Sequence, residues 1–164
     1  ARGSAVALGG ELWGEKGGRD FLSRGAGKVM GGGLKNGKPW LVGIRDPRSE
    51  PEDFFASLDV SDASTSTSGD YERYFLIDGV RYHHILDPRT GMPTQGVRSV
   101  TTVSPDATLA DALSTAIMVM GAGPGMALAE SLGVGVVLVD DAGRVLATPD
   151  LENRLVQRHP PRAQ

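Results

Sequence analysis

Residues 71–85 read YERYFLIDGVRYHHI, in which Asp78-Gly79 separates two segments rich in apolar and aromatic residues. An Asp-Gly pair favours the positive φ angles of a two-residue hairpin turn, so we predict one strand over 71–77 and a return strand over 80–85. Cross-strand partners around such a turn have residue numbers with a constant sum. The predicted pairs are Ile77–Val80, Phe75–Tyr82 and Arg73–His84.

The two adjacent histidines at the end of this hairpin have different neighbours. Successive strand residues point to opposite faces, so only one of His83 and His84 faces a given pocket. The register places His84 beside Arg73, and a nearby positive charge favours the neutral imidazole, the form that accepts a proton. From the residues alone, a histidine at the surface or core edge is the commoner case, and acid–base work by His84 is the alternative.

Composition limits the class of protein. With 164 residues and 40% hydrophobic content, the chain is long enough for one domain with its own core, and it shows no internal repeat or linker. The formal net charge of -3 gives no overall attraction to nucleic acid, so we expect no nucleic-acid partner. The absence of cysteine excludes a thiolate nucleophile. No apolar run approaches the ~20 residues of a membrane span.

Before the hairpin the sequence predicts strands and loops. Ala5–Leu8 and Leu12-Trp13 predict a strand that Gly9-Gly10-Glu11 interrupts. Glycines inside a strand often mark the approach of a ligand or another backbone. Residues 14–37 contain nine glycines and five basic residues, so we expect a flexible surface loop there rather than a phosphate-binding turn. Trp40–Ile44 predicts a further strand.

The hydroxyl-rich stretch Ser57–Ser68 contains seven Ser or Thr residues. This composition argues against a buried strand and favours an exposed segment or one that faces a polar ligand. In the second case its hydroxyls, with the backbone of residues 68–70, could surround a phosphate or ribose. Exposure alone explains the composition equally well.

After the hairpin the pattern alternates between strands and helices. Thr108–Met120 is the clearest helix, with Gly121 as its stop, and its apolar residues recur at the helical period. The expected stripe is Leu109, Ala112, Leu113, Ala116, Ile117 and Met120. The other expected elements are a turn over 87–91, strands over 97–103, 134–139 and 144–147, a short helix over 125–132, and a peripheral tail from Pro149.

Asp111 and Thr115 lie one helical turn apart, opposite the expected apolar stripe. A carboxylate and a hydroxyl at this spacing can both bind a hard cation such as Mg²⁺. The competing interpretation is structural, because Thr108 and Asp111 have the spacing of an imperfect capping box. The spacing alone favours the structural interpretation.

Three stretches, in order, resemble the successive signatures of one family, the ApbE-type FAD:protein FMN transferases. They are TSGDYERYF (67–75), YHHILDPRTG (82–91) and DALSTA (111–116). LGGE (8–11) resembles the glycine pair and acidic residue that come earlier in the family, and PWLVGI (39–44) resembles its next strand. The resemblance therefore covers most of the chain.

The resemblance implies an α+β fold, with a mixed or mainly antiparallel sheet and packed helices. It implies Mg²⁺-dependent transfer of FMN from FAD to a Ser or Thr hydroxyl of a target protein, which releases AMP. Asp111 and Thr115 would bind Mg²⁺, and His84 would be the base beside the flavin. The other residues implied to contact the cofactor are Gly10, Glu11, Ser68, Gly69 and Ile85.

The chain also departs from the family pattern. A substantial N-terminal region is missing, so residues 1–164 correspond to the C-terminal portion of one domain. The segment 14–37 is longer than the corresponding connection expected in the family. Two alternatives to transfer follow: hydrolysis of FAD to FMN and AMP, and a flavin-binding module without turnover. By resemblance the intact protein is periplasmic or membrane-anchored facing the periplasm, with any membrane attachment through a segment absent from this chain.

Overall fold

The computed structural model describes residues 2–15, 17–25 and 27–163, with the backbone alone for 2–7 and 11. Its helices are α1 (Arg2–Glu15), α2 (Ala107–Met120), α3 (Ala122–Ser131) and α4 (Pro149–Glu152). Its strands are β1 (Phe21–Gly25), β2 (Lys28–Gly32), β3 (Trp40–Arg45), β4 (Phe54–Val60), β5 (Ala63–Gly69), β6 (Tyr74–Ile77), β7 (Val80–His83), β8 (Val97–Ser104), β9 (Gly135–Asp140), β10 (Val145–Ala147) and β11 (Leu155–Gln157). None of the described helices is long and apolar enough to cross a membrane.

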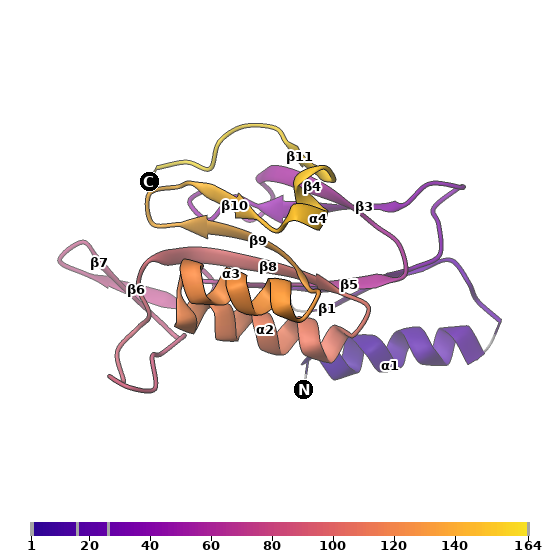
Figure 1. The fold of residues 1–164 in the computed structure, drawn as a ribbon, viewed down its shortest axis with the longest axis horizontal. Coiled ribbons are helices and arrows are strands. Elements are labelled where there is room, and N and C mark those ends of the chain that lie inside the picture. The colour runs from indigo at the N-terminus through magenta and orange to yellow at the C-terminus, as the bar shows by residue number, and fades with distance from the viewer. Residues whose placement is uncertain (1, 16, 26, 164) are drawn as a thin grey trace.

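The main sheet has six strands in the order β1-β2-β5-β8-β9-β10, and its pairings are antiparallel. Helices α2 and α3 lie on one face of this sheet, and the three-stranded sheet β11-β4-β3 lies on the other face (Figure 1). Alternate residues of a strand point to opposite faces. Accordingly, Val137 and Val139 of β9 pack between the two sheets, while Val136 and Leu138 pack against the helices. These layers confirm the predicted α+β fold.

The hairpin β6–β7 projects from one end of the main sheet (Figure 1) and has the predicted register. Asp78 and Gly79 have φ angles of 48° and 79°, as the two-residue turn requires. The rings of Phe75 and Tyr82 stack with their centroids 5.4 Å apart. Beyond the paired strands, the His84 N–H donates to the Arg73 carbonyl at 3.1 Å, which confirms the last predicted pair.

The N-terminal residues form helix α1, so the predicted strand over 5–13 is wrong. The expectation rested on Gly9-Gly10, because glycine disfavours helix interiors. In the structure Gly10 is buried where α1 packs on β1 and β2, and a Cβ atom there would lie 2.9 Å from Phe21 Cζ. Close packing against the sheet therefore outweighs the low helix propensity.

The prediction of a surface loop over 14–37 is also wrong, because this range contains the paired strands β1 and β2. Strand β2 continues the main sheet by pairing with β5. Two of its glycines make room for aromatic rings: a Cβ on Gly31 would lie 3.0 Å from Trp40 Cδ1, and one on Gly32 would overlap the Phe21 ring. Glycine here serves packing rather than flexibility.

The hydroxyl-rich stretch forms the second part of β4 and all but the last residue of β5, and both strands are largely buried, contrary to the expectation of an exposed segment. Burial is tolerated because neighbouring strands supply hydrogen-bond partners. Ser64 Oγ donates to the Val29 carbonyl at 3.0 Å, and the hydroxyls of Thr67 and Thr101 lie 2.9 Å apart. The composition therefore reflects a polar network inside the sheet.

The C-terminal tail is not peripheral. Leu151 in α4 is fully buried and belongs to the core between the sheets, and β11 pairs with β4. Pro149 is the first residue of α4, where its missing N–H costs no helical hydrogen bond. The proline at the start of the expected peripheral tail thus begins a helix.

Candidate functional site

A pocket of about 540 Å³ lies where β5, α2 and the end of the hairpin meet. It is lined by Gly27, Lys28, Thr67, Ser68, Gly69, Glu72, Arg73, His84, Asp111 and Thr115. Residues from all three family-like stretches therefore line one cavity. Five of the predicted site residues are among them: Ser68, Gly69, His84, Asp111 and Thr115.

Helix α2, which carries Asp111 and Thr115, is capped at its N-terminus by Asp106. The Asp106 carboxylate accepts hydrogen bonds from the N–H groups of Thr108 and Leu109, at 2.8 and 3.1 Å. The N-cap is therefore Asp106, and the structural interpretation of Thr108 and Asp111 as a capping box is wrong.

The buried face of α2 is rotated from the predicted stripe. Leu113 and Ile117 are buried as expected, but Ala112 is exposed and Ser114 is fully buried. Asp111 and Thr115 consequently lie at the edge of the buried face, on the side of β5, rather than opposite it.

A chain of hydroxyls joins α2 to β5. Ser68 Oγ lies 2.8 Å from Ser114 Oγ and 3.0 Å from Thr115 Oγ1. Ser66 Oγ, two residues earlier on the same face of β5, lies 3.2 Å from Ser114 Oγ. These contacts fix the position of α2 along the direction of β5, and they thereby fix the position of Asp111 over the sheet.

Lys28 is the main site residue that the sequence interpretation missed. It lies opposite Ser66 in the β2–β5 register, and its side chain is only 8% exposed. Its Nζ is 2.6 Å from Asp111 Oδ1 and donates to Ser66 Oγ at 2.6 Å. A buried ammonium thus occupies the position next to the carboxylate expected to bind Mg²⁺.

The two histidines are separated as the strand alternation predicts. His83 is buried, and its Nε2 lies 2.9 Å from the Thr94 carbonyl oxygen. His84 is exposed and lines the pocket together with Arg73. His84 is therefore the histidine available to a ligand, and its role as a base stays a prediction.

Two predicted cofactor contacts, Ile85 and Gly10, do not line this pocket. Ile85 is buried in the core beneath α2, its N–H donates to His83 Nδ1, and its carbonyl accepts from Thr94. Gly10 packs against Phe21. The Glu11 side chain lies outside the described residues.

The atoms around Asp111 suit a hard cation. Its carboxylate and the hydroxyls of Thr115 and Ser68 are oxygen donors of the kind that Mg²⁺ binds. The contact with Lys28 shows that this corner of the pocket already stabilises a positive charge. No group of three or more His, Cys, Asp or Glu side chains in the described part of the chain could hold a metal ion. A cation here would take its remaining contacts from waters or a bound ligand.

Comparison with known proteins identifies the family of this chain. Residues 1–138 match the model of the ApbE family. A FAD:protein FMN transferase from Rhodobacter capsulatus is 39% identical over 156 residues, which cover 94% of this chain and 30% of that protein. One from Vibrio cholerae is 41% identical over 106 residues, which cover 64% of this chain and 32% of that protein. The chain thus spans less than half the length of these curated relatives.

Solved structures share the fold. The crystal structure of the ApbE protein from Thermotoga maritima has a TM-score of 0.85 and 37% identity, over 93% of this chain and 50% of that chain. The flavin transferase ApbE from Vibrio cholerae has a TM-score of 0.79 and 31% identity, with the same coverage. Sequence and fold agree over most of these 164 residues, and the chain belongs to the ApbE family.

Proposed function

We propose that the intact protein transfers FMN from FAD to a Ser or Thr hydroxyl of a target protein and releases AMP. One observation carries the proposal: His84, Ser68 and Asp111, which come from three separate stretches of sequence, line the same pocket. The names of the curated relatives support transfer of FMN from FAD to a protein. The pocket combines an exposed imidazole with cationic side chains, which suits attack on a charged pyrophosphate.

In the proposed reaction, the acceptor hydroxyl oxygen attacks the phosphorus of the FMN half of FAD. The bond between this phosphorus and the bridging oxygen breaks, and AMP leaves with the electron pair. The hydroxyl proton passes to the unprotonated ring nitrogen of His84. Lys28 and Arg73, which both line the pocket, hold the pyrophosphate by charge and hydrogen bonding.

Asp111 and Thr115 are the residues proposed to hold Mg²⁺. When bound, the ion offsets negative charge on the pyrophosphate. Lys28 and the ion compete for the Asp111 carboxylate, because the ammonium lies 2.6 Å from Oδ1. We therefore propose that this chain binds Mg²⁺ more weakly than the same pocket would without Lys28.

The direct test uses full-length protein with FAD, Mg²⁺ and a candidate acceptor domain. A fluorescent covalent flavin band on the acceptor, with one AMP released per flavin attached, is expected. His84→Ala should abolish the band, whereas His159→Ala, outside the pocket, should leave it intact. Failure of the wild-type protein to label acceptors that related transferases modify would refute the proposal.

FAD hydrolysis is the second candidate, since the exposure of His84 leaves water as another nucleophile. It predicts AMP release at the same rate with and without acceptor, and no fluorescent band. Flavin binding without turnover is the third candidate, and the Lys28–Asp111 contact favours it because a filled cation position needs no metal. It predicts that FAD binds, that no AMP appears, and that Asp111→Ala leaves FAD affinity nearly unchanged.

A further inference from the structure

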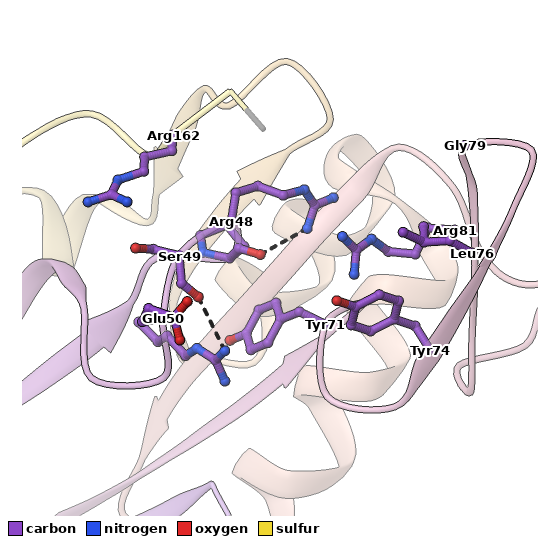
Figure 2. A pocket seen from close by; sticks show the side chains of 11 residues that line it. Arg48, Ser49, Glu50, Tyr71, Tyr74, Leu76, Gly79, Arg81 and Arg162 are labelled. Carbon is purple, nitrogen blue, oxygen red and sulfur yellow. Dashed lines mark hydrogen bonds between the residues drawn. The ribbon is translucent and has the colours of Figure 1, made fainter.

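A second pocket, of about 600 Å³, shares no lining residue with the site described above. Four arginines from separate parts of the chain line it: Arg45 at the end of β3, Arg48 in the next loop, Arg81 in β7 and Arg162 near the C-terminus. Figure 2 shows Arg81 beside the ring of Tyr74, while Arg162 lies apart from both tyrosine rings. The proposed flavin transfer uses none of these residues.

Two of the guanidinium groups share one carboxylate. Arg48 forms a two-pronged contact with Asp70, with nitrogen–oxygen distances of 2.7 and 2.6 Å. Arg81 Nε lies 4.0 Å from Oδ2 of the same Asp70. The side chains of Arg48, Arg81 and Asp70 are 14%, 22% and 9% exposed, so all three charged groups lie within the pocket wall. One carboxylate cannot neutralise two cations.

Two of the four guanidinium groups, those of Arg81 and Arg45, stack on tyrosine rings. The guanidinium carbon of Arg81 lies 3.8 Å from the centroid of Tyr74, and that of Arg45 lies 4.5 Å from the centroid of Tyr71. Stacking on an aromatic face fixes the plane of a guanidinium and leaves its N–H edge free to donate. The arginines are therefore positioned before any ligand arrives.

Two buried nitrogens lack a hydrogen-bond partner within the described part of the chain: Arg45 Nε and Arg81 Nη1. Buried polar groups without a partner are rare, because burial removes the water that would otherwise bind them. Both belong to stacked, partly buried arginines of this pocket. The described residues therefore leave part of the donor capacity of these two arginines unused.

The acids near the pocket do not fill this role. Glu72 lies 3.9 Å from Arg45 and Asp53 lies 2.9 Å from Arg162, but their side chains are 52% and 43% exposed, and Glu50 at the rim is exposed. Charges in water are screened and contribute little. Asp46 is fully buried beside the loop and is bonded to backbone N–H groups of Arg48 and Arg162. A positive excess remains inside.

We propose that this pocket binds a phosphate group, held by Arg45, Arg48 and Arg81 with the tyrosine hydroxyls as further donors. A tetrahedral phosphate presents oxygens to donors from several directions, whereas a planar carboxylate matches a single arginine fork. The cavity exceeds the size of inorganic phosphate, so a phosphate monoester also fits. The same chemistry could come from free phosphate or from an organic ester.

The test is isothermal titration calorimetry on the full-length protein with inorganic phosphate, phenyl phosphate and acetate. Saturable phosphate binding is expected, with Arg81→Met weakening it at least tenfold, which corresponds to about 1.4 kcal/mol. Arg144→Met is the matched control, because Arg144 is 77% exposed and outside the pocket, and it should bind as wild type does. Tighter binding of phenyl phosphate would identify an ester as the ligand, and equal or weaker binding would identify free phosphate.

A second variant guards against misfolding. Circular dichroism first establishes that Arg81→Met is folded; if it is not, Arg45→Met replaces it, with the same tenfold loss expected. Arg81→Lys should retain part of the affinity because it keeps the charge and loses the fork. The proposal is overturned if wild type shows no saturable phosphate binding, if acetate binds equally tightly, or if the folded variant binds phosphate as wild type does.

Discussion

Replacing Lys28 with Met tests whether a side chain of this protein occupies the position expected for a metal ion. Methionine keeps the length of the buried side chain and removes the ammonium that contacts Asp111 and Ser66. Two effects are expected with opposite signs. Without Mg²⁺ the folded state of the variant lacks the Lys28–Asp111 ion pair, and with Mg²⁺ present the ion no longer competes with an ammonium for the Asp111 carboxylate and binds more tightly.

The size of each effect follows from burial. Exposed ion pairs contribute about 0–1 kcal/mol, whereas removing one partner of a buried pair costs about 3–5 kcal/mol. The Lys28 side chain is 8% exposed and that of Asp111 is 24% exposed, so the pair lies between these limits. We expect Lys28→Met to lower the free energy of unfolding by about 1–3 kcal/mol in EDTA, within the range bounded by those cases.

Magnesium should restore this loss. A ligand at about 100 times its dissociation constant stabilises the folded state by about 2.7 kcal/mol. If displacing Lys28 costs about 1.4 kcal/mol or more, the variant binds Mg²⁺ at least about tenfold more tightly than wild type.

Urea unfolding of the purified protein, followed by circular dichroism in EDTA and in a Mg²⁺ series, measures both effects. Lys38→Met is the control, since Lys38 is exposed and remote from Asp111 in the sequence. Equal stability of Lys28→Met and wild type in EDTA would refute the ion-pair argument. An equal Mg²⁺ response in both proteins would refute competition for Asp111.

Three further substitutions test the network, the tail and the buried phenol. Ser68→Ala removes contacts to Ser114 and Thr115, so we expect a loss of about 1–2 kcal/mol in urea unfolding, against no change for Ser131→Ala at the end of α3. Leu151→Ala should cost about 2–5 kcal/mol, because a fully buried leucine leaves a cavity, whereas Val156→Ala on the exposed side of β11 should cost little; similar values for the two would restore the peripheral tail. Burial raises the pKa of Tyr71, and nearby Glu72 raises it further, so the folded state keeps the phenol proton after the unfolded state has lost it. Stability from this group is therefore present below the unfolded tyrosine pKa of about 10 and falls as the pH rises above it. Tyr71→Phe should flatten this fall in the free energy of unfolding, measured between about pH 9 and 12. An unchanged dependence of the unfolding free energy on pH would contradict the assignment.

The hairpin was predictable because its determinants are local. Asp78-Gly79 sets the turn, and the register follows from the turn length, so the Arg73–His84 pair could be derived from the residues alone. The helix carrying Asp111 and Thr115 was predictable for the same reason, since its apolar period and Gly121 stop are continuous in the sequence. The resemblance then identified which of its polar residues to consider.

Lys28 could not be found this way, because its environment is created by distant strands. The residues around it are rich in glycine, and those glycines accommodate Phe21 and Trp40, which only the folded sheet brings near. Its two partners are 38 and 83 residues away in the sequence, in β5 and α2. A local pattern of basic residues and glycine is typical of a loop, and the long-range pairing of β2 with β5 overrides it.

The burial of the hydroxyl-rich strand explains how the fold positions the pocket. An apolar β5 would pack against α2 without a strong preference for one height of the helix, because dispersion contacts are not directional. Ser66 and Ser68 instead contact Ser114 and Thr115 at hydrogen-bond distance, and a shift of α2 by one residue would break these contacts together. The same helix carries Asp111, while β5 leads directly into Gly69 and the loop that reaches Arg73. The buried hydroxyls that argued against a core strand are therefore the contacts that set the separation between the carboxylate of α2 and the hairpin histidine.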